Sequence, residues 1–278
     1  MEYLALFIWL ALCLLVGALV HYLMSGALSH RAVQLLAAPG MIVRKVTMTV
    51  VALLCGGTVT RVSIYQLAPQ DVDFRADGIA SVAKVLVPLA PLFGGAVAMM
   101  KLNVLFGSPL NLSYTHPSLA ALNVSGFRGF FYGTWLILSS IVGQAIRADW
   151  QTLRLYVMFA LIFSLALGAC SAFPRVKEAL LGAVLVTVAL ALFSSIAVRR
   201  AGVLAASPEW FTAARSFIVN CAGVAFLMMV YGVLIAFPVG LCVRLFETMS
   251  KGGAKGSSRK RGRAKGASAD DEDDRLAA

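Results

Sequence analysis

The sequence predicts an all-α polytopic membrane protein with six or seven transmembrane helices. Of its 278 residues, 60% are hydrophobic and only 13% are charged, and the mean hydropathy is +0.84. A soluble domain has about 45–50% apolar and about 25% charged residues, so this chain has too little charge to cover a surface in water. Since a membrane-crossing helix needs about 20 apolar residues, the length before the charged C-terminal segment fits six or seven such helices with short loops.

Seven apolar segments follow one another along the chain. The first, 3–24, is longer than the apolar core of a signal peptide and lacks its cleavage site, so we expect it to stay as a helix. Pro39-Gly40 is expected to open the second, 41–56, because proline suits the first turn of a helix, and Gly56-Gly57 to end it. Pro88, Pro91 and the glycine pair at 94–95 are expected to interrupt the third. The third to seventh segments are expected at 79–100, 129–146, 155–173, 179–198 and 217–246.

Two segments outside these helices have a different composition. Residues 59–66 are rich in β-branched side chains, which predicts a short surface β-element near residues 58–67, followed by a polar loop at 68–77. From residue 250 the chain is rich in Gly, Ser and charge and has too little apolar surface to fold alone. We therefore expect a transmembrane domain, 1–249, and a disordered, charged tail, 250–278.

The charge distribution indicates how the chain lies in a membrane. The net charge is +11, and the basic block between Lys251 and Lys265 follows the last apolar segment closely, which predicts a cytoplasmic C-terminus and, with seven spans, an external N-terminus. We expect an integral protein of a bacterial inner membrane, although an organelle membrane stays open. The lipid bilayer is an expected partner, and nucleic acid is not, since no basic stripe with interleaved aromatic residues exists outside the tail. Contacts with anionic lipid, or a role in fixing topology, are expected for Arg259, Lys260, Arg261, Arg263 and Lys265.

The stretch from residue 39 to 65 resembles the active-site helix of membrane metallopeptidases of the site-2-protease type. In one bacterial branch this helix reads Pro-Gly, three apolar residues and then His-Glu-x-x-His, followed by an apolar turn, a small-Gly pair and a basic, Val-rich strand. Pro39-Gly40 and Gly56-Gly57 match that frame. The positions of His-Glu-x-x-His are occupied by Arg44, Lys45, Val46, Thr47 and Met48.

This resemblance implies a catalytically degenerate relative. In His-Glu-x-x-His, two imidazoles hold zinc and the glutamate is the general base. Arg44 stays protonated and cannot bind zinc, Lys45 is no carboxylate base, and Met48 offers only a thioether. The junction at 173–178 resembles a Pro-Ser-x-x-Asp turn that supplies the third ligand, which puts Glu178 in the acidic position. We therefore expect no catalytic residue, no metal and no cofactor.

Two interpretations of Arg44 and Lys45 stay open. Their side chains either extend to the headgroup region, as basic residues at helix ends do, or occupy the place of the zinc, where Arg44 pairs with Glu178. The three histidines, His21, His30 and His116, are alternative metal or haem ligands. Only His21 lies near an apolar segment, so the pattern does not favour that role.

The sequence supports three hypotheses on function. The first is a non-catalytic membrane subunit or scaffold that binds partner membrane proteins through a pseudo-peptidase groove. The alternative is a small-solute or ion transporter or channel, suggested by the broken third segment and by charges beside the spans. The third is an active intramembrane metalloprotease with unusual ligands.

Overall fold

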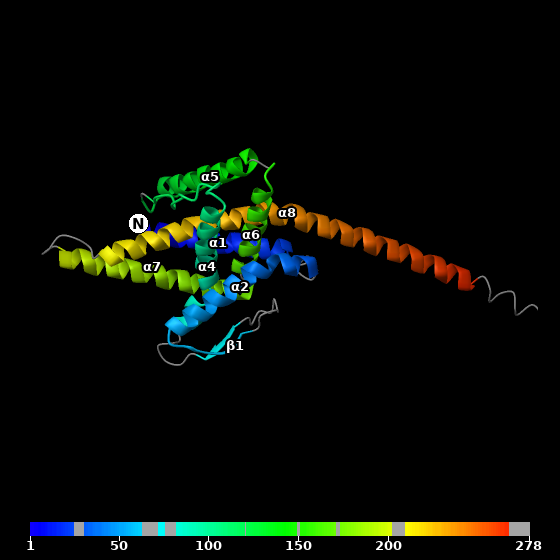
Figure 1. The fold of residues 1–278 in the computed structure, drawn as a ribbon, viewed down its shortest axis with the longest axis horizontal. Helices are drawn as coiled ribbons and strands as arrows, with labels where there is room; N and C mark the ends of the chain where they lie inside the picture. Colours follow the sequence, from blue (N-terminus) through cyan, green and yellow to red (C-terminus); the bar gives the residue numbers. More distant parts are fainter. Residues whose placement is uncertain are drawn as a thin grey trace, which may run out of the picture.

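The computed structural model describes residues 1–24, 31–62, 72–75, 82–119, 121–148, 151–170, 173–201 and 209–266. These residues form a mostly helical structure with one small sheet (Figure 1). The predicted helical class is therefore confirmed. The elements are α1 (Glu2–Met24), α2 (Arg31–Leu54), β1 (Thr58–Val62), β2 (Val72–Arg75), α3 (Ala83–Leu86), α4 (Ala90–Leu105), α5 (Val124–Arg147), α6 (Leu153–Ala169), α7 (Phe173–Ala201) and α8 (Glu209–Gly266).

Several of the described helices are long and apolar enough to cross a membrane, which indicates a membrane protein. Helices α4 and α6 are apolar but shorter, so six spans require one of these two helices in addition to the longer ones, and seven spans require both. The five longer stretches are Glu2–Met24, Gln34–Leu54, Val124–Arg147, Val176–Ile196 and Glu209–Val243.

Helix α6 lies at the centre of the bundle. In Figure 1, α4 and α6 run steeply across the direction of α1, α7 and the first part of α8. Helix α6 contacts α1, α2, α4 and α8, and every residue from Ile162 to Cys170 is buried. A helix that is apolar on all sides is typical of such a fully surrounded position.

Helices α1 and α8 pack side by side and run in the same direction. The indole nitrogen of Trp9 donates to the carbonyl of Ala222 at 3.2 Å, and its ring lies 4.3 Å from that of Phe226, measured between centroids. Near the other end of α1, the backbone of Leu23 approaches Gly240 so closely that a Cβ there would meet its carbonyl oxygen at 2.8 Å. Because the contact nearer the C-terminus of α1 is also nearer the C-terminus of α8, the two helices are parallel.

The start of α2 differs from the sequence prediction. Pro39-Gly40 does not open the helix, because α2 begins at Arg31 and Pro39 lies inside it. Proline removes one backbone donor and disturbs the turn before it. The N–H of Gly40 bonds outside its own helix, to the hydroxyl of Ser164 at 2.9 Å. A neighbouring helix thus satisfies the disturbed backbone, which is how membrane proteins tolerate proline within helices.

The surface β-element is a two-stranded antiparallel hairpin, in which β1 pairs with β2. Strand β1 confirms the expected element for residues 58–62, whereas residues 63–67 lie outside the described part. Strand β2 corrects the prediction of a polar loop at 68–77. Val72 and Phe74 lie two residues apart and hence on one face of the strand, and Val72 packs with Met48 and Ala52 of α2. The acidic residues around them obscured this short apolar pattern.

The third apolar segment is broken, as predicted. Helix α3 ends at Leu86 and α4 begins at Ala90, so Pro88 lies in the break and Pro91 in the first turn of α4. Two helix ends differ from the predicted ones by a few residues. Helix α4 continues to Leu105 instead of residue 100, and α6 ends at Ala169 instead of residue 173.

Helix α8 extends beyond the predicted boundary of the transmembrane domain. It continues to Gly266, into the segment expected to be disordered, while 267–278 lie outside the described residues. An established helix is extended more easily than a new one is nucleated. The seven basic residues and two alanines of residues 251–266 favour helix, whereas the five glycines of this segment disfavour it. The side chains from 244 onward, which include the five expected lipid contacts, are outside the described part of the chain.

Asn103 fixes the turn that follows α4. Its side-chain nitrogen donates to the carbonyl of Leu110 at 3.0 Å, and its oxygen accepts from the N–H of Leu110 at 3.1 Å. Asn103 is 7% exposed and Leu110 is 5% exposed, so water cannot replace these bonds. Between them Gly107 and Ser108 adopt positive φ angles, of 86° and 57°.

We predict that Asn103→Leu lowers the free energy of unfolding by about 2 kcal/mol, because it leaves a buried donor and a buried acceptor unsatisfied. Thermal unfolding in detergent measures the loss. Asn111→Ala is the control, since the Asn111 side chain accepts only an exposed bond from the N–H of Ser113. Equal midpoints for the two variants would contradict a structural role for Asn103.

Candidate functional site

The stretch of α2 that resembles a metallopeptidase helix packs on α6 with direct backbone contact. A Cβ placed on Gly40 would lie 1.8 Å from the carbonyl oxygen of Ser164, and one on Gly168 would lie 2.2 Å from the carbonyl oxygen of Gly40. Ser164 and Gly168 are four residues apart and present a small-xxx-small face to α2, the pattern that lets helices in lipid approach closely. This crossing places residues 44–48 next to the C-terminal end of α6.

Arg44 binds the end of α6. Its Nη1 atom donates to the carbonyl of Gly168 at 3.1 Å and to that of Cys170 at 2.5 Å. The last carbonyls of a helix have no partner within it, and together they carry a partial negative charge. A guanidinium is always charged and offers several donors in one plane, so Arg44 both satisfies these carbonyls and neutralises the helix end. These two bonds place its guanidinium at the C-terminal end of α6.

Lys45 and Met48 lie on the buried face of α2. Lys45 is 5% exposed and Met48 is 2% exposed. Met48 packs in a small apolar cluster with Ala52, Val72, Ala83 and Val87, which joins α2 to the hairpin and to the start of the third segment. The burial of Lys45 does not support the interpretation in which its side chain extends to the headgroups.

Glu178 lies on an exposed part of α7. The bonds shown for Arg44 go to backbone carbonyls, so the arrangement gives no support to an ion pair between Arg44 and Glu178, which stays a prediction. Among the histidines, His21 of α1 lies within electrostatic range of Arg44, and His30 is outside the described residues. Across the described ranges, no three His, Cys, Asp or Glu side chains come together in a way that fits a metal ion.

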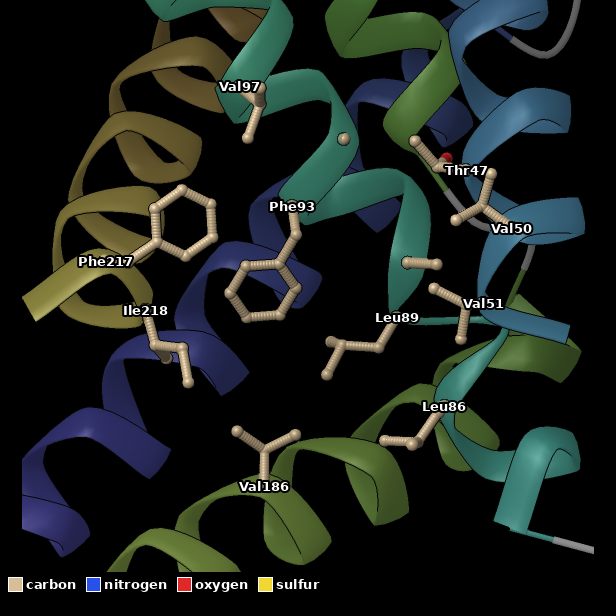
Figure 2. Close-up of a pocket in the computed structure, with 12 residues that line it drawn as sticks. Thr47, Val50, Val51, Leu86, Leu89, Phe93, Val97, Val186, Phe217 and Ile218 are labelled. Carbon is tan, nitrogen blue, oxygen red and sulfur yellow. The ribbon is translucent and has the colours of Figure 1, made fainter. Parts of the chain in front are cut away.

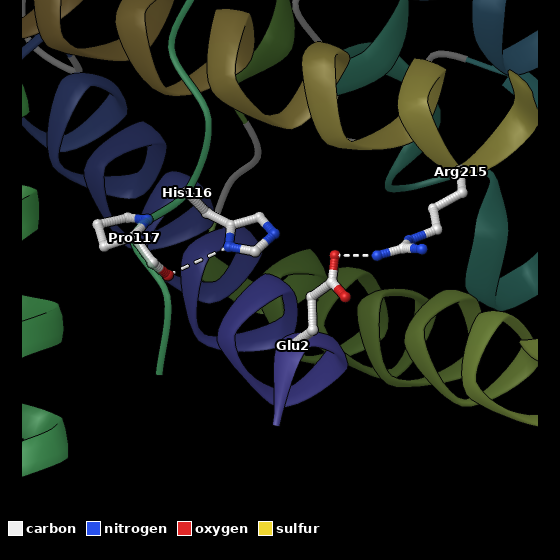
Figure 3. A network of polar contacts seen from close by, with 4 residues as sticks. All are labelled: Glu2, His116, Pro117 and Arg215. Carbon is white, nitrogen blue, oxygen red and sulfur yellow. Dashed lines mark hydrogen bonds and ion pairs between the residues drawn. The ribbon is translucent and has the colours of Figure 1, made fainter. Parts of the chain in front are cut away.

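His116 takes part in a local contact at the end of the bundle that holds the start of α1. Its Nδ1 atom lies 3.2 Å from the carbonyl oxygen of Pro117 (Figure 3). In the same view Glu2 of α1 forms an ion pair with Arg215 of α8. The guanidinium of Arg215 also lies 6.0 Å from the centre of the Tyr3 ring. The ion pair between Glu2 and Arg215 and the contact of Arg215 with Tyr3 join the parallel starts of α1 and α8.

An apolar cleft lies on the outer side of the same stretch of α2. Its volume is about 490 Å³, and its lining comes from α2, α3, α4, α7 and α8. Figure 2 shows the side chains pointing into one space between these helices. Val50 and Phe217 line the cleft and are 47% and 53% exposed, so it opens on the surface. The labelled lining residues are Thr47, Val50, Val51, Leu86, Leu89, Phe93, Val97, Val186, Phe217 and Ile218.

Among the described residues, the lining offers no unused polar side chain. Thr47 carries the only side-chain hydroxyl of this described lining, and the Oγ1 atom of Thr47 already donates to the carbonyls of Val43 and Arg44, at 2.9 Å each. The cleft therefore suits an apolar surface better than a solute with hydrogen-bonding groups.

Comparison with models of protein families, with curated proteins and with solved structures finds no match. The resemblance to the site-2-protease type rests on the residues quoted above and stays a prediction.

The sequence indicated Arg44, Lys45 and Met48 as one group but not their surroundings. Gly168 and Cys170 are more than 120 residues away along the chain from Arg44. The glycine pair at 94–95 was interpreted as part of a helix break, whereas Gly94 lies within α4 and meets α2: a Cβ there would be 2.0 Å from the Cγ2 atom of Thr47. A small residue in an apolar helix was the available signal for this contact.

Proposed function

We propose that this chain is a non-catalytic membrane subunit or scaffold that binds a transmembrane helix of a partner protein at the apolar cleft. The observation that carries the proposal is the lining of the cleft, which is apolar and opens on faces of α2, α7 and α8, helices with the length and composition of membrane spans. Transmembrane helices associate through close packing and not through the hydrophobic effect. A partner helix lying across the opening would insert a few large side chains into the cleft.

The degenerate zinc positions have a structural role in this proposal. A cation in the middle of a membrane helix is costly and needs a partner or a function. The bonds from Arg44 to the end of α6 supply such a partner without a metal. They also hold α2 at a fixed position, and α2 forms one wall of the cleft.

A small-solute or ion transporter is the second candidate, because of where Arg44 and Lys45 lie. The apolar stretch Gln34–Leu54 has 21 residues, so Arg44 is halfway along it and Lys45 follows at 5% exposure. Buried ionisable groups at this depth are typical of transport pathways. An active metalloprotease stays the third alternative, which metal analysis of the purified protein addresses directly.

The parallel packing of α1 and α8 favours an odd number of membrane crossings. If both helices cross the membrane in the same direction, an odd number of crossings must separate them, since the chain has to return to its starting side. This favours five or seven spans over six. With the basic C-terminal block in the cytoplasm, we propose that the N-terminus is external, in a bacterial inner membrane.

We predict that a photo-crosslinking amino acid at Val186, which lines the cleft, captures a transmembrane segment of one partner protein in native membranes. Val188 of the same helix is 48% exposed and does not line the cleft, so the same probe there should capture lipid only. Mass spectrometry of the adduct identifies the captured peptide.

A pair of tryptophan variants tests the cleft independently. Val186→Trp should fill it and remove the crosslinked partner from a probe at Val50, whereas Val188→Trp should leave that adduct unchanged. Equal capture from positions 186 and 188 would overturn the cleft as the binding site. Metal analysis of the same preparation covers the third alternative, because one zinc per chain would contradict a non-catalytic role.

A further inference from the structure

A second cavity, of about 450 Å³, lies between α2, α4 and α6, near the N-terminal half of α2. It is separate from the cleft proposed for the partner helix, and the two share no lining residue. Leu105 lies at its edge and is 78% exposed, so this cavity opens on the surface of the bundle. Its lining includes Pro39 and Val43 of α2, Ala98 and Lys101 of α4, and Leu161 and Leu165 of α6.

Among the described residues that line this cavity, Lys101 is the only charged one and the others are apolar. Lys101 is exposed, so its ammonium group sits where the cavity meets the surroundings. A cavity with apolar walls and one cation at its opening matches a molecule with a long apolar chain and one anionic group. Lysine is a common ligand of phosphate, which it binds as a point charge.

We propose that this cavity binds one acyl chain of an anionic phospholipid whose phosphate contacts the Nζ atom of Lys101. The proposed topology supports this ligand. The C-terminal ends of α1 and of the apolar stretch of α8 lie at one end of the bundle, which the basic segment places in the cytoplasm, and α2 starts from that side. Anionic lipids of the cytoplasmic leaflet attract basic groups there.

The test is native mass spectrometry of the full chain in detergent, titrated with phosphatidylglycerol or with phosphatidylcholine carrying the same acyl chains. The expected result is one tightly bound phosphatidylglycerol per chain and weaker binding of phosphatidylcholine. Lys101→Gln should weaken phosphatidylglycerol binding about fivefold, the factor expected for one basic group near a lipid surface, and leave phosphatidylcholine binding unchanged.

Two further variants separate the charge from the cavity. Lys177→Gln removes an exposed lysine of α7 that does not line the cavity and should bind both lipids as the unmodified chain does. Ala98→Phe should reduce binding of both lipids by filling the cavity. If that variant does not fold, Lys101→Gln alone decides the question.

Three outcomes would overturn the proposal. They are equal affinity of the unmodified chain for the two lipids, an equal loss in Lys177→Gln and Lys101→Gln, and tighter binding of a free fatty acid than of phosphatidylglycerol. None of them bears on the partner helix, because that cleft has a different lining.

Discussion

Gly168→Ala is expected to lower the free energy of unfolding on the order of 3 kcal/mol, at the upper end of the range for overpacked cores. The new methyl group would lie 2.2 Å from the carbonyl oxygen of Gly40. That atom belongs to the backbone of α2, so no rotation of a side chain can remove the overlap. The two helices would have to separate, and the hydrogen bond from Gly40 to Ser164 would be lost with them.

Gly40→Ala should have an effect at least as large, since its methyl group would lie 1.8 Å from the backbone oxygen of Ser164. The measurement is the thermal unfolding midpoint in detergent, together with the yield of monodisperse protein. Gly143→Ala in α5 is the matched control: a Cβ there meets nothing within 4 Å. Alanine favours helix over glycine by about 1 kcal/mol, so the control should be unchanged or more stable. If Gly168→Ala unfolds at the same temperature as Gly143→Ala, the result would contradict the close packing of α2 on α6.

Local signals in the sequence predict where helices end better than they predict which helices pack together. Gly56, which ends the turn after α2, has a φ of +77°, and glycine is the residue expected there. Pro88 correctly indicated a break. Pro39 carried the same kind of signal, yet α2 continues through it because Ser164 supplies an acceptor for the next N–H. Nothing near Pro39 in the sequence reveals that contact.

The candidate site shows the same limit. The resemblance to a metallopeptidase helix puts Arg44, Lys45 and Met48 at the positions of His-Glu-x-x-His, and it predicts that these positions hold no zinc. The acidic partner expected for Arg44, Glu178, was chosen from a motif. The structure brings the backbone carbonyls of Gly168 and Cys170 to Arg44, and backbone atoms carry no residue-specific signal.

Arg44→Met is expected to lower the free energy of unfolding by about 2–3 kcal/mol, the range for hydrogen bonds made by charged groups. The variant keeps an apolar side chain of similar length but leaves the carbonyls at the end of α6 without their donor. Arg44→Lys keeps the charge and loses the planar arrangement of donors, so its effect should be intermediate. Arg128→Met, an exposed arginine of α5, is the control for the substitution itself and should unfold with the unmodified protein.

A double-mutant cycle with Arg44→Gln and Glu178→Gln then decides between the two partners proposed for Arg44. If the guanidinium serves the end of α6, the two losses should add to within about 0.5 kcal/mol, as for independent sites. A coupling well above that value would restore the ion pair predicted from the sequence. Additive losses, together with an unchanged adduct from a probe at Val186 in Arg44→Lys, would mean that Arg44 supports the fold while the cleft beside it binds the partner.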